Sequence, residues 1–455
     1  MLKDLFKFTF NYSITNILAK LTNFLFLPLF TYFLPAEDYG IYSLITVFTI
    51  LITIFVDSGT QFYLQSKSIN NDLNVIIDKS INFISINAFA SFIIFVLLTP
   101  IFSKLIFSST NISVIIIISL LGMLFESTAN YAALILKTTQ QLKQLYITSI
   151  LSFILQIVLL PFFLVFLKLG YISIFLTQII VNVILLVYLQ KTIHFNFNFR
   201  IDYKEYKNFI IFVFPILLTN LLTIGIDLID RYILNFYVTI SEIGIYSFAY
   251  KFANIIKIIA YSFLPAWISI IIKEKNNKNY KHLVSKNFYK VTFIFLILAF
   301  IFYILTKIFF HFGVFNKSYQ TNDIVYLTLN LSYALYGIIN FLYFYPYSIE
   351  NPKIILYSDI IGFTTNIIFN LILIPIYGIE GAALSTFISF LLACIYLINV
   401  VSNKFHNFID FNKIILIITI FVSCSVILFL YTSIIVTILV FLTLLFFLFF
   451  IYYSS

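Results

Sequence analysis

Long apolar segments, scarcely interrupted by charge, are the feature that most limits how this chain can fold. Residues 41–56 and 291–308 approach the roughly 20 residues that an α-helix needs to cross the hydrocarbon core of a bilayer. Of the 455 residues, 62% are hydrophobic and 10% are charged, whereas a soluble domain is about half apolar and about a quarter charged. The runs lack the alternation of a transmembrane β-strand. We therefore predict an all-α integral membrane protein.

Other features of the composition narrow the classes further. The first apolar block, residues 8–33, is longer than a signal-peptide core and is expected to remain as a helix. Cys394 and Cys424 fall in apolar runs and the four histidines are scattered, so we expect no disulfide framework, metal site or cofactor. The net charge is +9, and basic residues in a membrane protein usually mark the loops on the cytoplasmic side. We therefore expect no nucleic-acid partner.

Turns with Pro, Gly, Asn or charge divide the chain into fourteen predicted helices. The expected spans are 8–33, 41–66, 79–105, 112–136, 144–167, 171–190, 208–236, 242–272, 288–313, 324–348, 355–376, 379–402, 414–431 and 433–453. With the N-terminus inside, 19 of the 27 Lys and Arg residues fall on the cytoplasmic side and four near the outer side. This asymmetry predicts that both termini are cytoplasmic.

Two weak internal matches indicate a repeat. Gly40-Ile41-Tyr42-Ser43 recurs 204 residues later as Gly244-Ile245-Tyr246-Ser247, and a turn at Gly170 recurs 208 residues later at Gly378. Parallel repeats of this kind place a substrate site between two halves that alternate in access. The alternative is a generic outer-turn sequence in a chain rich in Tyr and Ile. The predicted parts are an N-lobe (1–190), a cytoplasmic connection (191–207), a C-lobe (208–402) and a C-terminal helix pair (403–455).

Polar side chains recur at three- and four-residue intervals in three predicted helices, and each set therefore shares one helix face. Charge inside a bilayer is costly, so these faces should meet a cavity or a polar partner and not lipid. Cations there could attract the phosphate of a lipid carrier. Arg231 could instead be neutralised by Asp227 and Asp230 on its own helix. The predicted substrate-cavity residues are Asn16, Lys20, Asn220, Arg231, Lys251, Asn254 and Lys257.

Embedded acidic residues form a second group of candidates. Asp57 and Glu126 lie within predicted spans, as do Asp227 and Asp230. Each could bind a coupling proton or sodium ion, or could balance an embedded lysine. We keep both hypotheses for these four residues.

Several short strings, in this order, resemble the polysaccharide biosynthesis proteins. That family contains bacterial oligosaccharide-lipid flippases, O-antigen flippases among them, and lies in the superfamily that also holds MATE drug exporters. The strings span nearly the whole chain: Phe26-Leu27-Pro28-Leu29, Leu34-Pro35-Ala36-Glu37-Asp38-Tyr39-Gly40-Ile41-Tyr42, Asp57-Ser58-Gly59, Asp230-Arg231-Tyr232-Ile233-Leu234, Gly244-Ile245-Tyr246-Ser247, Ala249-Tyr250-Lys251, Ala266-Trp267, Asn370-Leu371-Ile372-Leu373-Ile374-Pro375 and Gly378-Ile379-Glu380-Gly381-Ala382-Ala383.

The resemblance implies a two-lobed transporter of the bacterial inner membrane that flips an undecaprenyl-pyrophosphate-linked repeat unit outward, for O-antigen, capsule or another surface glycan. Arg231 and Lys251 fall on positions that would line its cationic cavity. Membrane lipid and other polysaccharide-assembly proteins are the partners it implies. The embedded acidic residues differ from the cationic cavity that the resemblance implies. They keep open a drug or cation exporter of the same fold, and a polysaccharide polymerase or ligase is the alternative from another class.

Overall fold

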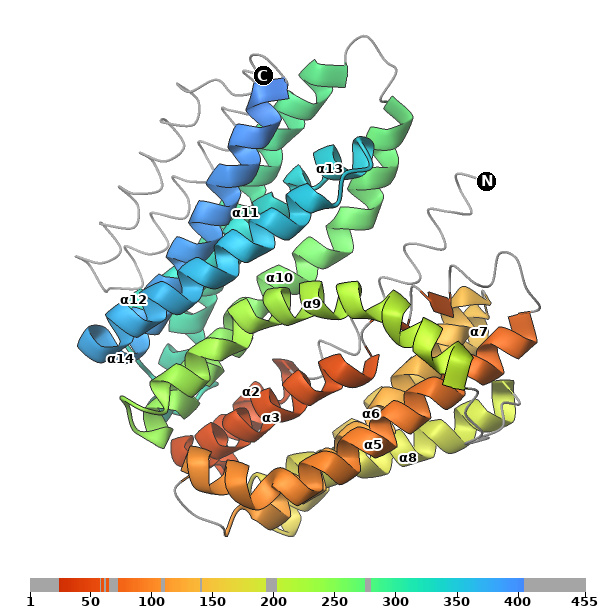
Figure 1. The fold of residues 1–455 in the computed structure, drawn as a ribbon. Helices are drawn as coiled ribbons and strands as arrows, with labels where there is room; N and C mark the ends of the chain where they lie inside the picture. Colours follow the sequence, from red (N-terminus) through yellow and green to blue (C-terminus); the bar gives the residue numbers. More distant parts are fainter. Residues whose placement is uncertain are drawn as a thin grey trace. The chain divides into compact units, whose positions relative to one another are not determined.

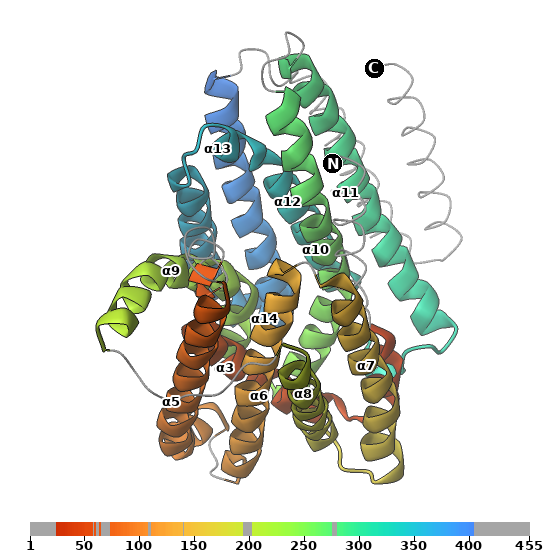
Figure 2. The same ribbon diagram turned by 90° about the vertical axis from the view of Figure 1, so that its right-hand side faces the viewer.

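The structure is a computed structural model that describes residues 24–57, 59–60, 63–64, 73–107, 111–139, 141–193, 203–274 and 280–404. Its chain divides into two compact units, Met1–Asn235 and Phe236–Ser455. Throughout the described ranges the regular structure is helical. Figures 1 and 2 show the helices of each unit packed side by side.

The first unit contains a short N-terminal helix and a bundle of long ones. The elements are α2 (Leu27–Phe33), α3 (Ala36–Asp57), α5 (Leu73–Phe107), α6 (Ser113–Thr138), α7 (Leu142–Pro161) with a π-helical turn (Phe162–Phe166), α8 (Ile172–Ile193) and α9 (Tyr203–Leu234). α6 lies between α5 and α8, and α3 packs against α5, α6 and α9 (Figure 2). α9 bends by 43° between Phe214 and Ile216, where Pro215 removes a backbone N–H donor.

The second unit contains the remaining described helices. They are α10 (Ile240–Glu274), α11 (Tyr280–His311), α12 (Asp323–Leu342), α13 (Phe344–Ser348) and α14 (Lys353–Lys404), with a 3-10 turn at Lys317–Tyr319. α12 packs against α10, α11 and α14 and forms the centre of this unit (Figure 1). α14 is two helices joined at Gly378, whose φ of 54° and ψ of −129° favour glycine.

Most predicted spans correspond to a described helix. By length and composition, nine described helices could cross a membrane, or ten if the bent α9 is one span. The all-α multi-pass fold is therefore confirmed, and the number fourteen stays a prediction. The predicted spans 355–376 and 379–402 are the two arms of α14. Spans 414–431 and 433–453, and most of 8–33, lie outside the described residues.

One predicted span is interrupted. The second was expected to run from residue 41 to residue 66, but α3 ends at Asp57, and residues 60, 63 and 64 are helical again beyond the break. Gly59 follows with a φ of 78°, in the left-handed region that commonly terminates a helix. A side chain at Gly59 would also approach the Cα of Val213 on α9 to 3.2 Å. Helix termination and close packing therefore both favour glycine at this position.

Local structure supports the predicted repeat. α3 begins at Ala36 and α10 at Ile240, which is the same 204-residue offset as in the sequence. Gly170 and Gly378, the second matched pair, have φ values of 58° and 54°. Within each unit the corresponding helices also have the same neighbours: α6 contacts α3, α5 and α8, as α12 contacts α10, α11 and α14.

The contact division does not follow the predicted lobe boundary. α9 packs against α3 within the first unit, which extends to Asn235, whereas the predicted connection is residues 191–207. A division by contacts is a different criterion from a division by internal repeat. The boundaries 1–190, 191–207, 208–402 and 403–455 therefore stay predictions, and the last part lies almost wholly outside the described residues.

Small and polar side chains join the helices of the second unit. Lipid is as apolar as leucine, so close packing and hydrogen bonds contribute much of helix association in membranes. Asn370 donates to Asn366 Oδ1 at 2.9 Å, and Asn366 donates to Ser389 Oγ at 3.5 Å, which links the two arms of α14. Gly337 lets α12 approach α11, because a Cβ there would lie 2.5 Å from the Phe295 ring.

We expect Gly337→Ala to lower the free energy of unfolding by about 1–3 kcal/mol, because an added methyl group overpacks the α11–α12 contact. Thermal unfolding of the purified protein in detergent measures the change. Gly122→Ala is the matched control, since its nearest neighbour across the helix interface is 3.5 Å away. Equal melting temperatures for the two variants would contradict the close packing at Gly337.

Candidate functional site: a polar cavity in the first unit

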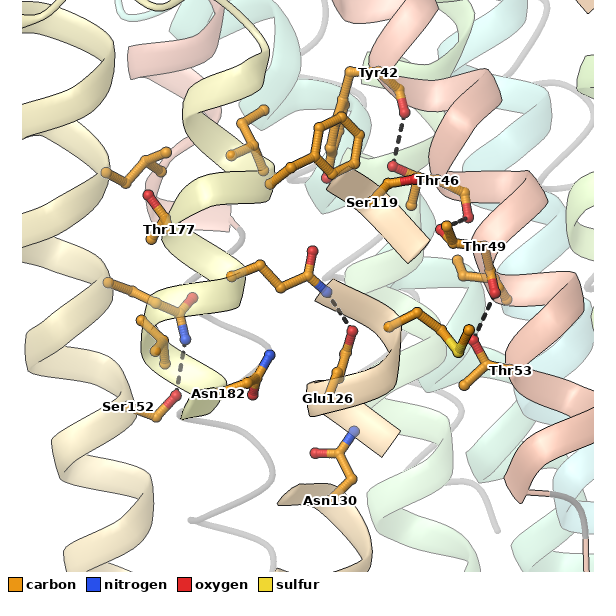
Figure 3. Close-up of a pocket in the computed structure, with 18 of the residues that line it drawn as sticks. Tyr42, Thr46, Thr49, Thr53, Ser119, Glu126, Asn130, Ser152, Thr177 and Asn182 are labelled. Carbon is orange, nitrogen blue, oxygen red and sulfur yellow. Dashed lines mark hydrogen bonds between the residues drawn. The ribbon is translucent and has the colours of Figure 1, made fainter. Parts of the chain in front are cut away.

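The first unit contains a cavity of about 600 Å³ (Figure 3). Its walls come from α2, α3, α6, α7, α8 and α9, and α3, α6, α7 and α8 are each long and apolar enough to cross a membrane. Ligand pockets usually have volumes of about 300–1,000 Å³, which makes this space suitable for an organic ligand as well as for an ion.

One wall is a polar face of α3. Tyr42, Thr46, Thr49, Thr53 and Asp57 recur at intervals of three or four residues and therefore lie on one side of the helix. The hydroxyls of Thr46 and Thr53 each donate 2.7 Å hydrogen bonds to the carbonyl four residues earlier. Their hydroxyl oxygens keep capacity to accept a further hydrogen bond. The threonine hydroxyls of this face therefore donate within their own helix and can still accept a hydrogen bond from a donor in the cavity.

The opposite wall joins α6 to α8. Gln178 on α8 donates a hydrogen bond to Glu126 on α6, and the labelled side chains of Glu126, Asn130 and Asn182 face the same space (Figure 3). Within the described part of the chain, the amides of Asn130 and Asn182 form no hydrogen bond. Each amide group can donate two hydrogen bonds and accept two. This wall therefore has unused capacity for both donating and accepting groups.

Two carboxyl groups approach the cavity from different helices. Asp57 ends α3 and Glu126 lies in the middle of α6, and the two are close enough to interact electrostatically. The described lining residues include no Lys, Arg or His. Coulomb interactions are strong where little water screens them. The described lining thus favours a cation or a neutral hydrogen-bonding ligand over an anion.

The predicted substrate-cavity residues are divided between the two units. Asn220 on α9 lines the cavity, and with it lie the predicted coupling residues Asp57 and Glu126. Asn16 and Lys20 fall outside the described residues. Lys251, Asn254 and Lys257 lie on α10 in the second unit. A single cavity lined by all the predicted residues therefore stays a prediction.

Arg231 is buried near the end of α9 and lies beside an acid. Its Nη1 is 3.5 Å from Asp230 Oδ1 and donates a 2.7 Å hydrogen bond to the backbone carbonyl of Asp227. The Asp230 side chain is fully buried and that of Arg231 is 5% exposed. The ion pair supports the hypothesis that Arg231 is neutralised on its own helix, with Asp230 as the described carboxylate partner.

Lys257 has an aromatic environment in the second unit. Its Nζ lies 4.9 Å from the ring centre of Tyr336, and 5.7 Å and 5.8 Å from those of Tyr261 and Tyr333. A cation within about 6 Å of a ring is attracted by its π face. Asn254 and Lys251, about one and two turns nearer the start of α10, are half-buried. The tyrosines explain how Lys257 can be buried, while substrate contact stays a prediction for all three.

Several lining residues were missed by the sequence analysis. Thr46, Thr49 and Thr53 on α3 show the same spacing as the three stripes that were found, so their periodicity could have revealed them. Gln156, Gln178 and Asn182 are isolated amides in apolar runs. Only the packing of α7 and α8 shows that they face a common space. Among the described residues, no group of three or more His, Cys, Asp and Glu could hold a metal ion.

The fold and its cavity define a multi-pass helical membrane protein with the architecture of a transporter. The chain belongs to the polysaccharide biosynthesis protein family, whose model matches residues 5–269. This confirms the resemblance carried by the sequence strings. No curated protein matches the sequence.

Solved structures share the fold at low sequence identity. The lipid II flippase MurJ, in an inward closed conformation, is 19% identical with a TM-score of 0.72, and the match covers 96% of this chain and 97% of that one. An inward-facing multidrug resistance MATE family transporter of the MOP superfamily is 13% identical with a TM-score of 0.61, covering 85% and 95%.

A third structure of this fold is a MOP superfamily transporter from Pyrococcus furiosus. It is 12% identical with a TM-score of 0.59, and the match covers 88% of this chain and 96% of that one. For that protein, the reverse polarity of its binding pocket suggests a different function. At these identities the likeness shows the fold alone.

The buried pair leads to a prediction about Arg231. We expect Asp230→Asn and Arg231→Gln each to lower the free energy of unfolding by about 3–5 kcal/mol, because each leaves a buried charge without its opposite. The double variant should recover much of that loss. Thermal unfolding of the two single variants and the double variant in detergent measures the three losses of stability, which together form a double-mutant cycle. Additive losses would show that the pair is not coupled and would favour a substrate-binding role for Arg231.

Proposed function

We propose that this protein is a flippase that moves an undecaprenyl-pyrophosphate-linked oligosaccharide from the cytoplasmic to the outer leaflet of the bacterial inner membrane. The family and the transporter fold support this proposal. The observation that carries it is a polar cavity of about 600 Å³ lined mainly by helices that could cross a membrane. Alternating access to such a cavity would pass a sugar head group across the bilayer for assembly of O-antigen, capsule or another surface glycan.

A polar cavity addresses the main physical obstacle to flipping. Moving a hydroxyl or amide from water to an apolar medium without a hydrogen bond costs roughly 2–7 kcal/mol. An oligosaccharide has many hydroxyls, so its passage through lipid would be prohibitively slow. The threonine face of α3 and the amides of α6 and α8 offer replacement hydrogen bonds. The lipid tail can stay in the surrounding membrane during the transfer.

Cations are proposed to attract the pyrophosphate. Lys251 is our first candidate, with Lys20, Lys257 and Arg231 as further positions, and Asn16, Asn220 and Asn254 supply polar groups on the same helix faces. A lysine ammonium binds phosphate as a point charge. Arg231 is the weakest of the four candidates, because Asp230 already lies beside it.

Asp57 and Glu126 are proposed to couple transport to a proton or a sodium ion. Two carboxylates in a site with little water repel each other, and a bound proton or cation reduces that repulsion. Binding there would link the ion to the conformation of α3 and α6, which carry the two groups. Asp227 and Asp230 are less favoured, since Asp230 lies against Arg231.

A drug or cation exporter is the second candidate function. It is supported by the acidic lining of the cavity, which would attract an organic cation, and by the MATE-like fold. Drug susceptibility separates the two proposals: an exporter raises the resistance of a sensitive host to cationic dyes, and a glycan flippase does not. The polymerase or ligase alternative is less favoured, because the solved proteins that share the fold are transporters.

We propose that the protein lies in the inner membrane with both termini in the cytoplasm. The lysine asymmetry of the loops supports this orientation. Membrane lipid and other polysaccharide-assembly proteins are its proposed partners.

Deleting the gene should leave the lipid-linked oligosaccharide on the cytoplasmic leaflet, since a polar glycan crosses the hydrocarbon core very slowly without a polar path. Lectin binding to the glycan shows which leaflet contains it: a lectin reaches the outer leaflet of intact spheroplasts and the cytoplasmic leaflet of inverted vesicles. Wild-type protein should restore outward transfer, and Lys251→Ala should reduce it at least tenfold at equal protein abundance. Lys251→Arg, which keeps the charge, should retain more activity than Lys251→Ala.

Lys104→Ala is the matched control, because Lys104 is exposed near the end of α5 and outside the cavity. Unchanged lectin accessibility in the deletion strain would contradict the flippase proposal. Loss of transfer in both lysine-to-alanine variants would contradict a specific role for Lys251.

Coupling predicts that Glu126→Gln removes the dependence of flipping on an ion gradient. In proteoliposomes with lipid-linked oligosaccharide, a proton or sodium gradient should accelerate transfer by the wild type. The same gradient should leave the rate of transfer by the variant unchanged. Asp57→Asn should behave in the same way. A gradient response that survives in both variants would assign coupling to other groups.

A further inference from the structure

We propose that the cavity of the first unit is a glycan-binding subsite, selective for sugar repeat units that are neutral or carry amino groups over units with carboxylate-bearing sugars. This inference rests on the proposed function and deepens it. It assigns the sugar end of the substrate to named side chains of one unit, and it assigns a charge preference to that substrate.

The hydrogen-bonding capacity of the lining suits a sugar. Each sugar hydroxyl donates one hydrogen bond and accepts others, so a sugar needs partners of both kinds at short intervals. Asn130 and Asn182 offer both, and within the described residues neither amide is engaged. The Thr46 and Thr53 hydroxyls already donate to their own helix and offer oxygen acceptors. A site for a bare ion would need few of these groups.

An aromatic wall complements the polar one. Phe30, Tyr42 and Phe175 line the cavity, and the Tyr42 ring centre lies 5.5 Å from that of Phe175 and 6.5 Å from that of Phe30. Sugar rings have an apolar face of C–H groups as well as hydroxyl edges. Aromatic walls with a few placed polar groups are the usual composition of a small-molecule pocket. The lining thus matches both faces of a sugar ring.

The carboxyl groups supply the charge preference. Asp57 and Glu126 line the same space, and none of the described lining residues is basic. A carboxylate-bearing sugar would bring a further negative charge beside this acidic pair, where there is little water to weaken the repulsion. An ammonium group would be attracted instead. Specificity of this kind arises from repulsion of the wrong ligand as much as from attraction of the right one.

The test uses the full chain in lipid nanodiscs and the glycan that mild acid releases from the lipid extract of the deletion strain. Calorimetry measures its dissociation constant. We expect Asn182→Leu to weaken binding at least tenfold, because a leucine of similar size leaves sugar hydroxyls without partners. Gln190→Leu is the matched control on the same helix, since Gln190 is exposed and outside the cavity. Asn130→Ala, at a more exposed position, is a second variant should Asn182→Leu fail to fold.

Charge preference is tested with three probes of similar size: maltotriose, which is neutral, the glucosamine trimer, which is cationic, and trigalacturonic acid. Saturation-transfer NMR on the wild type should show binding of the first two and at least tenfold weaker binding of the acid. In the double variant Asp57→Asn, Glu126→Gln, the affinities for the neutral and the acidic probe should differ less than in the wild type. Mass spectrometry of the released glycan should show a repeat unit without carboxylate sugars.

The outcomes separate this inference from the proposed function. Equal affinity of the wild type and of both cavity variants for the released glycan would overturn the subsite, as would an acidic repeat unit or tight binding of trigalacturonic acid. The lectin assay on the deletion strain is independent of these results. If the chain transfers lipid-linked oligosaccharide and the cavity variants bind the glycan as tightly as the wild type, the results support the flippase proposal and contradict the glycan-binding subsite.

Discussion

The absence of water from the hydrocarbon core is the constraint on which the rest of the structure depends. Backbone groups must find partners within the chain, so the described spans are helical. Polar side chains face the same requirement and gather where they can contact one another. In the second unit they join the arms of α14, through Asn366, Asn370 and Ser389. In the first unit they line a cavity, in which Asn130 and Asn182 form no hydrogen bond with the described part of the chain.

The two units share one arrangement of helices but differ in the charged side chains that they bury. The matched helices α3 and α10 begin 204 residues apart, and the matched glycines at 170 and 378 both have a left-handed φ. The charged groups on this common scaffold differ. The first unit has Asp57 and Glu126 around its cavity, whereas the second buries Lys257 among tyrosines. A repeat can therefore preserve packing while side chains diverge, because helix contacts depend mainly on size and on the turns, and binding depends on a few polar groups.

Embedded charge is where the sequence left most to the tertiary structure. The embedded cations suggested a cationic cavity, which stays a prediction, whereas the cavity described in the first unit has carboxyl groups, and Arg231 lies against Asp230. Intervals along a helix show that polar residues share a face, and do not show which other helix that face meets. The pairing of Glu126 with Gln178 joins positions 52 residues apart and has no local signal. By contrast, the threonine face of α3 has a period that the sequence displays openly.

By itself the sequence determined the membrane environment, the helical class, the repeat and the family, because hydropathy, helix-ending glycines and short family strings are local properties of the chain. The glycine at 59 marked the end of α3, although its meaning became clear only from the backbone and from Val213. Tertiary structure alone decided that Asp57, Glu126, Asn182 and Asn220 line one space and that Arg231 and its sequence neighbour Asp230 are both buried. Those facts depend on how helices distant in sequence pack, and a bilayer constrains the length and polarity of each helix far more than the choice of its neighbours.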